Sequence, residues 1–514
     1  GEPRLMEMYV LSSIALIILL ISGMNFVTLS IGTSSKRAIE IGLRKVIGAP
    51  RNQIIRQLLT ESLLLVTFAF ILGSALTVLA LPVFNELAEK SIGFSTVFLP
   101  INLLWIIVII AAFGFSAGSY PAFIVSNLRI VEILKGKLKM SGKNRITRTL
   151  VTAQFACSVF LIIATLVMSK QINFFINMDL GFQKNNIIAV YMQDKSIKSG
   201  LRTHNLLREK LTQYSVIHSI ASASNSFGPG GNFYDYSYND EEFEANVMAV
   251  DHDYFPTLEI EFLQGRNFSR EIMTDFSSIV VNESLVKDLE LEEPVGKHLD
   301  FAGKQYRIIG VVNDNFTHAP QHGIMPTISL IDTLIALNFT LVKTDGNSDA
   351  ETLTLLQDTW KEIHPDRPFL HSFLDEDVEA EFAGVRRWKA IIQYAAGFAV
   401  LIACMGIFGI TALILNKRNK EICIRKVHGA TTGGLFALLS RDYITWIVAA
   451  NIIAWPAGWY IMNKWLDNFA NKISLSPIVF IIPFFVIVAL VMISISFQII
   501  KAVRANPVDS LRYE

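Results

Sequence analysis

Residues 40–49 read E-I-G-L-R-K-V-I-G-A, and residues 421–430 read E-I-C-I-R-K-V-H-G-A. Seven of the ten positions are identical at an offset of 381 residues. Each copy directly follows a long apolar run and precedes another run, which carries an acid near its start, Glu61 or Asp442. Internal repeats of this kind are common in membrane transport proteins. The segment therefore indicates a chain built from two related membrane halves.

Seven apolar runs surround these two segments. A hydrocarbon core of about 30 Å is crossed by about 20 helical residues, and each run is long enough. The runs lie near residues 8–31, 58–81, 101–124, 149–169, 390–415, 438–462 and 477–500. The clustering of apolar residues predicts an α-helical transmembrane bundle of about seven spans with a parallel internal repeat.

The formal net charge of +0 conceals a strong asymmetry. Residues 171–385 contain 33 acidic and 15 basic residues, whereas the remainder contains 12 acidic and 30 basic residues. A water-soluble acidic domain is therefore inserted into a basic membrane part. Such a domain would repel phosphate, which argues against a nucleic-acid partner and leaves membrane lipid as the environment of the basic part.

The distribution of Lys and Arg in the short loops predicts the topology. Loops 32–57, 125–148 and 416–434 are rich in basic residues, and the loops between the other spans are poor in them. The positive-inside rule places these three loops in the cytoplasm and residues 171–387 outside. We predict a first transmembrane domain over 1–148, a span and stalk over 149–170, an extracytoplasmic domain over 171–387 and a second transmembrane domain over 388–514.

The predicted outer domain alternates strand-like and helix-like patterns, which indicates an α+β fold. Residues 187–191 and 306–312 read as strands, and 201–213 and 350–363 read as amphipathic helices. Several acids, including Asp251, Asp253 and Asp314, leave open a catalytic or Ca²⁺-binding role. Because acids are so frequent in this region, we interpret them instead as a solvated acidic surface.

The chain contains no recognisable catalytic motif. It has no G-x-x-x-x-G-K-[ST] phosphate-binding loop and no H-E-x-x-H, and no Ser/His/Asp arrangement stands out. Its three cysteines all lie outside residues 171–385, and no His/Cys spacing resembles a zinc site. We therefore expect a non-catalytic membrane subunit with no catalytic, cofactor-binding or metal-binding residues of its own.

The repeated segment is the candidate functional site. A basic pair alone is explained by the positive-inside rule, but the recurrence of Glu, Gly and Ala at fixed offsets is not. Each copy is expected to form a short amphipathic helix ended by a glycine. The residues are Glu40, Arg44, Lys45, Gly48, Glu421, Arg425, Lys426 and Gly429. Two such cytoplasmic helices suit an ATPase partner with two-fold symmetry.

Two other features of the spans lead to expectations. Acids inside a membrane span are functional candidates, but Glu61 and Asp442 lie near span ends and are better explained as interfacial. Small residues allow close helix packing in membranes, which we expect at four glycines. These glycines are Gly114, Gly118, Gly406 and Gly409.

The residues R-x-x-E-I-G-L-R-K-V-I-G-A at 37–49 resemble the MacB/FtsX-like permeases of ABC transporters. Residues 281–285, 294–297 and 306–314 are similar to the periplasmic core domain of that group. The stretches at 179–182 and 365–369 resemble its eight-span Bacteroidota-type variant. The resemblance implies four spans per half, so we expect this chain to lack the first span and the first periplasmic domain.

The resemblance implies a bacterial inner-membrane subunit that works with a separate ABC ATPase. That ATPase is expected to be a dimer and to carry the ATP and Mg²⁺. Movement of the outer domain (mechanotransmission) would export or release a drug, peptide or lipoprotein. Two alternatives stay open. One is signalling to an envelope enzyme through a periplasmic protein, and the other is a membrane receptor that works without an ATPase.

Overall fold

The computed structural model describes residues 2–88, 90–127, 145–193, 197–227, 233–238, 241–301, 303–316, 323–331, 335–346, 349–427 and 431–504. The chain divides into two compact units. The membrane unit comprises residues 1–170, 387–465 and 474–514, and the outer unit comprises residues 171–386 and 466–473. The short segment 466–473 lies outside the range predicted for the outer domain.

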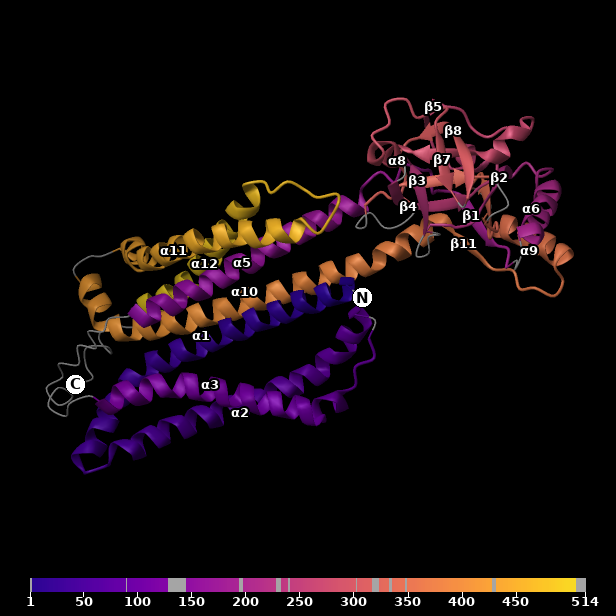
Figure 1. Cartoon of the computed structure of the whole chain (residues 1–514). Coiled ribbons are helices and arrows are strands. Elements are labelled where there is room, and N and C mark those ends of the chain that lie inside the picture. The colour runs from indigo at the N-terminus through magenta and orange to yellow at the C-terminus, as the bar shows by residue number, and fades with distance from the viewer. Residues whose placement is uncertain are drawn as a thin grey trace. The chain divides into compact units, whose positions relative to one another are not determined.

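Long helices build the membrane unit (Figure 1). They are α1 (Glu2–Val46), α2 (Arg51–Ala88), α3 (Pro100–Asn127), α5 (Arg145–Ile176), α10 (Leu374–Val427), α11 (Thr432–Leu466) and α12 (Ile478–Arg504), with a short 3₁₀ helix, η1 (Phe94–Phe98), before α3. Six of the predicted spans are confirmed as helices long and apolar enough to cross a membrane. The predicted span near 101–124 falls in α3, whose side chains the structure describes as one apolar stretch over Pro100–Ser116.

The prediction of separate short helices in loops 32–57 and 416–434 is wrong. The helix α1 continues without a break from its apolar part to Val46, and α10 continues to Val427. Residues 34–46 contain no proline or glycine other than Gly42, so nothing in the chain interrupts the hydrogen-bond ladder. Each repeated segment therefore begins as the end of a long helix.

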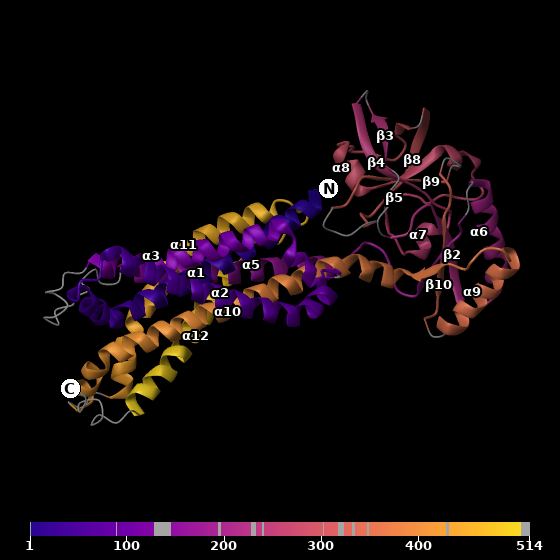
Figure 2. The same cartoon turned by 90° about the horizontal axis from the view of Figure 1, so that it is seen from below.

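Glycines let the helices of the membrane unit approach closely, as predicted. Figure 1 shows α2 and α3 side by side, and a Cβ built on Gly114 would lie 2.5 Å from Leu63 Cδ2. A Cβ on Gly409 would lie 2.6 Å from Leu29 Cδ2, where α10 meets α1. Figure 1 shows α1 beside α10, where Asn25 Nδ2 donates to Ile402 O at 2.6 Å, and Figure 2 shows the same helices from below. These separations are shorter than ordinary van der Waals contact, so any larger residue would push the helices apart.

A four-stranded antiparallel sheet forms one part of the outer unit. Its order is β11 (His371–Phe373), β1 (Ile187–Tyr191), β10 (Phe339–Thr344) and β2 (Ile217–Ala223). The helices α6 (Ile197–Leu211) and α9 (Asp349–Ile363) contact each other, and their side chains Leu207 and Trp360 are buried in the same core as the sheet residue Val342. The predicted α+β fold is confirmed here.

A second sheet closes into a ring. Its order is β5 (Phe262–Gly265), β8 (Lys304–Val312), β6 (Ser278–Asn282), β9 (Thr327–Leu330), β4 (Glu241–Ala249), β3 (Phe233–Tyr238) and β7 (His298–Phe301). The strand β7 also pairs with β8, through His298↔Arg307 to Phe301↔Lys304. The strands from β8 to β7 therefore form a closed barrel, and β5 extends it at one side. Short helices α7 (Tyr254–Thr257), η2 (Met273–Ser277) and α8 (Glu283–Asp288) connect the strands.

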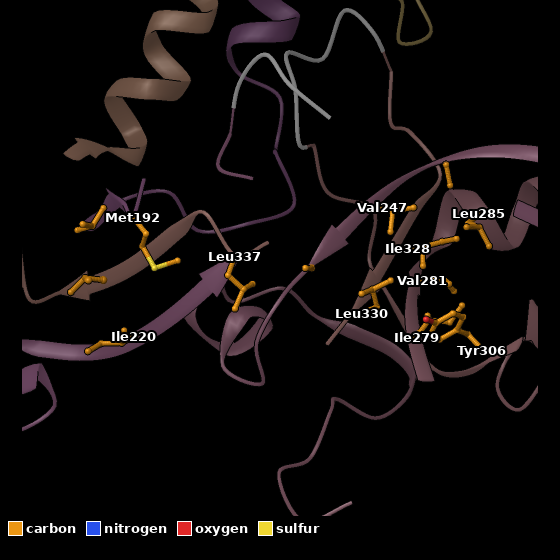
Figure 3. Packing of buried hydrophobic residues seen from close by; sticks show 14 of the residues in the cluster. Met192, Ile220, Val247, Ile279, Val281, Leu285, Tyr306, Ile328, Leu330 and Leu337 are labelled. Carbon is orange, nitrogen blue, oxygen red and sulfur yellow. The ribbon is translucent and has the colours of Figure 1, made fainter. Parts of the chain in front are cut away.

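Alternating residues of these strands fill the barrel. Figure 3 shows Val247, Ile279, Val281, Ile328 and Leu330 converging from neighbouring strands. All five side chains are fully buried. Burial of one Val, Leu or Ile side chain stabilises a fold by about 1.5–3 kcal/mol. This core holds the outer unit together.

The segment 466–473 is fastened to the end of α5 by one glutamine. The side chain of Gln171 is fully buried, and its Nε2 donates to Asn471 O at 2.7 Å. Ile473 N donates back to Gln171 Oε1 at 2.9 Å. Phe469 packs against Phe175, with ring centroids 5.5 Å apart. The connection between α11 and α12 is thus an integral part of the outer unit.

Candidate functional site

The first repeated segment forms a polar corner between α1 and α2. Arg44 Nη2 lies 2.7 Å from Glu40 Oε1, one helical turn away. Arg44 Nη1 donates to Gln57 Oε1 at 2.5 Å, and Gln57 Nε2 donates to Glu61 Oε1 at 3.2 Å. The structure thus brings Glu40, Arg44 and Glu61 into one chain of hydrogen bonds. Glu61 is thus a member of this exposed network, and its interfacial position stays a prediction.

Gly48 ends α1, as the sequence indicates. Its φ is +97°, a conformation that favours glycine. Gly48 N donates to Lys45 O at 3.0 Å, and Ala49 N donates to Arg44 O at 3.0 Å. These bonds satisfy carbonyls at the helix end. The tight turn allows α2 to begin at Arg51, only a few residues later.

Sequence reasoning missed an apolar surface at the same corner. Leu43 is 53% exposed, Val46 is 54% exposed and Ile47 is 87% exposed. These three side chains lie beyond the apolar span Met8–Thr33, at the end of α1 that is predicted to be cytoplasmic. The sequence does carry a signal for this surface. Large apolar residues that stand among Arg and Lys outside a membrane span indicate a contact with another protein. Burial and the nearby Arg51 lower the pKa of Lys45.

The second copy is described only in part. Glu421, Arg425 and Lys426 lie in α10, for which the structure describes the backbone at these positions. Gly429 lies outside the described residues. The two copies therefore share a position at the end of a long helix.

The interpretation of the outer acids as a solvated surface is wrong for Asp251. This residue is 8% exposed, and its Oδ2 lies 3.1 Å from Nε2 of the buried His204. Asp253 contacts Arg208 at 2.8 Å and Arg270 at 2.6 Å. Burial, together with the Asp251 carboxylate, raises the pKa of Asp253. Chain folding brings these charges together, which single-sequence patterning does not reveal.

Asp314 is also structural. Its Oδ1 accepts from Ser284 N at 2.8 Å and its Oδ2 accepts from Ser284 Oγ at 2.9 Å, at the N-terminus of α8. A carboxylate is favoured there because the first amides of a helix lack intrahelical partners. Across the part of the chain that the structure describes, no group of three or more His, Cys, Asp or Glu is placed to hold a metal ion.

The fully buried Asp275 is paired with Arg266 through two bonds of 2.7 Å. Ser269 N donates to the same carboxylate at 2.8 Å. The guanidinium, chiefly through its hydrogen bonds, lowers the pKa of Asp275. A folded pKa below the unfolded value of about 3.9 stabilises the fold above that pH. The stabilisation is lost as the pH falls through the folded pKa.

Replacing Arg266 with glutamine is therefore expected to destabilise the outer unit at pH 7 by about 2 kcal/mol. The value is below the range for a fully buried pair because the arginine side chain is 43% exposed. Hydrogen exchange of peptides covering β6 in the full chain, measured from pH 7 to well below the unfolded pKa of about 3.9, follows the loss. The difference between the two proteins should shrink as the solution approaches the pKa of Asp275. A constant difference would contradict a charge-based role.

Comparisons with known proteins match the helical parts of the chain and the inserted domain separately. A sequence model described as FtsX-like permease C-terminal matches residues 12–130 and 394–507, and one described as MacB-like periplasmic core domain matches residues 155–355. The chain is similar to the macrolide export ATP-binding/permease protein MacB of Bdellovibrio bacteriovorus, at 38% identity over 131 residues, covering 24% of this chain and 19% of that protein.

Two further similarities are found. The uncharacterized ABC transporter permease YknZ of Bacillus subtilis is 22% identical over 307 residues, covering 54% of this chain and 72% of that protein. The crystal structure of the periplasmic region of MacB from Actinobacillus actinomycetemcomitans covers 39% of this chain and 94% of that chain, at 17% identity and a TM-score of 0.30.

The chain spans 19% of the length of the Bdellovibrio MacB and 47% of that of the Neisseria meningitidis MacB. The matched FtsX-like segments coincide with the helices that carry the two repeated segments. The matched core domain lies between them in the chain. With helical spans on both sides of an inserted MacB-like domain, the chain belongs to the MacB/FtsX-like permease family of ABC transporters.

Proposed function

We propose that this chain is the permease subunit of an inner-membrane ABC transporter and that a separate ATPase, with its ATP and Mg²⁺, docks on the two repeated segments. The observation that carries the proposal is the duplicated segment at the ends of α1 and α10. The outer unit would lie in the periplasm. It would export or release a drug, peptide or lipoprotein when the ATPase changes conformation.

The corner between α1 and α2 supports a docking role for the first segment. Arg44 is held by Glu40 and Gln57, so its main task is to fix the shape of the corner. The exposed Leu43, Val46 and Ile47 then supply an apolar contact surface. An exposed corner with an apolar tip suits a protein–protein contact, because apolar anchors at the centre of an interface carry most of its binding energy.

The proposed path of motion follows the helices. Residues 145–170 of α5 belong to the membrane unit and residues 171–176 belong to the outer unit, and α10 is divided similarly at residue 386. Both helices are continuous through these positions. A displacement at the cytoplasmic end of α10 would therefore reach the outer unit without passing through a flexible linker.

The test is co-purification of ATP-hydrolysing activity with the full chain in detergent. We expect the double variant Arg44→Glu with Arg425→Glu, and separately Ile47→Asp, to lower the associated activity by about 10-fold or more. Lys90→Glu is the matched control, because it reverses an exposed charge in a loop predicted on the other side of the membrane. Equal activity in all variants would refute docking at these segments, and no ATPase with the unmodified chain would favour a receptor.

A further inference from the structure

The contacts between α1 and α10 join residues that the internal repeat makes equivalent. The offset of 381 pairs Asn25 with Gly406 and Gly32 with Leu413. A Cβ built on Gly406 overlaps the side-chain amide of Asn25, and one built on Gly32 lies 2.6 Å from Leu413 Cδ1. Residue numbers increase together along both helices at these contacts. The two helices are therefore parallel and in register.

Both helices use the same face for this contact. Ile21 is fully buried in one cluster with Ala399 and Ala403, and its counterpart Ile402 packs against that cluster. Thr28 is 2% exposed, and its counterpart Gly409 meets α1 at Leu29. In an interface with a two-fold axis, residue i of one element contacts residue j of the other and the reverse, and residues on the axis meet their own counterparts.

The equivalent positions are complementary in size rather than identical. Asn25 Nδ2 donates to Ile402 O at 2.6 Å, and its amide oxygen occupies the place that a side chain at 406 would need. Further along the pair of helices, the glycine is on α1 and the large residue, Leu413, is on α10. Two asparagines at the first position would collide, and two glycines would leave a gap.

We infer that α1 and α10 meet on an internal two-fold axis. In the pairs Asn25–Gly406 and Leu413–Gly32 a large residue fits against a glycine, so each pair requires one helix from each repeat. A single chain then fills both sides of the axis. The same helix from a second copy would bring identical residues together and is excluded from this position.

If the proposed function holds, the axis determines how many ATPase subunits one chain engages. The helices α1 and α10 lead directly into the repeated segments at 40–49 and 421–430. Parallel helices in register would present these segments as a two-fold pair. One chain would therefore engage two ATPase subunits, whereas the axis itself requires no ATPase.

A reciprocal exchange tests the axis without a partner protein. Asn25→Gly removes the amide, and Gly406→Asn places an amide opposite Asn25. The double variant should restore the contact with the roles of the two helices exchanged. The amide introduced by Gly406→Asn would face the carbonyl of Ile21, the counterpart of Ile402. Gly397→Asn is the matched control, since a Cβ at this position of α10 meets nothing within 4 Å.

We expect each single change to lower the midpoint of thermal unfolding of the full chain by about 4 °C or more. The double variant should melt above both single variants, and the control should show only the smaller cost of an added amide inside a span. A double variant that melts at or below either single variant would overturn the axis. If the single variants do not fold, the exchange of Gly32→Leu with Leu413→Gly provides the same comparison. This result is independent of ATPase docking, so failure of one proposal does not imply failure of the other.

Discussion

Gly406→Ala is expected to destabilise the membrane unit by about 2 kcal/mol, although alanine is the better helix former by about 1 kcal/mol. The added methyl group overlaps the amide oxygen of Asn25. Asn25 has a short side chain, so it can yield only by giving up its bond to Ile402 O. Either that hydrogen bond or the close approach of α1 and α10 is lost.

Thermal unfolding of the purified full chain measures this change, and Gly397→Ala is the matched control. Both glycines lie in the interior of α10, but a Cβ at Gly397 meets nothing within 4 Å. The control should be neutral or slightly stabilising, as expected from helix propensity alone. Equal behaviour of the two variants would mean that the contact with Asn25 contributes nothing. Adding Asn25→Ala to Gly406→Ala should recover part of the loss, since it removes the colliding amide.

Gly181→Ala is expected to destabilise the outer unit by about 3 kcal/mol. Gly181 has a φ of +75°, which costs an alanine about 1–2 kcal/mol. A Cβ there would also collide with the backbone carbonyl of Asp314, which a rotamer change cannot relieve. The turn is fixed on both sides, because Gly181 N donates to Asp179 Oδ1 at 3.0 Å and Phe316 N donates to Leu180 O at 2.9 Å.

Gly303→Ala separates the cost of the positive φ from the cost of the collision with Asp314. Its φ of +74° is almost the same, but a Cβ there meets nothing within 4 Å. We expect it to show only the conformational cost, about 1–2 kcal/mol. Hydrogen exchange of outer-unit peptides in the full chain measures both variants. If Gly181→Ala is no more harmful than Gly303→Ala, the collision with Asp314 is relieved by backbone adjustment.

The sequence is sufficient to predict the membrane helices and the type of outer domain. Apolar runs of the required length rarely occur outside membrane helices, so six spans are located correctly. The strand at Ile187–Tyr191 and the helix α9 are recognisable from their residue patterns. The glycine packing sites are also predictable, because small residues in long apolar helices commonly mark close contacts. These features depend on local sequence or on the general properties of the bilayer.

Features that depend on distant contacts are not predictable in this way. The closure of the barrel rests on pairing of β7 with both β3 and β8, and strand-like patterns do not specify partners. The buried position of Asp251 escapes prediction because its partner His204 is distant in sequence. At the first repeated segment, the repeat identifies Arg44 and Gly48, but the apolar tip at Ile47 becomes visible only when the exposed side chains are known. The continuity of α1 is missed because the end of the apolar run marks where the helix leaves the membrane and not where the helix ends.

The attachment of 466–473 to Gln171 limits how modular this protein is. An exchange of residues 171–386 with those of a relative would separate Gln171 from Asn471 and Ile473, the two residues whose backbones it bridges. In this chain the backbone groups of Asn471 and Ile473 would lose their hydrogen-bond partner, and Phe469 would lose its contact with Phe175. The outer unit is therefore discontinuous in sequence, and both of its parts must be exchanged together. A functional hybrid must carry the α11–α12 connection together with the domain, so the two stretches are expected to change together during divergence.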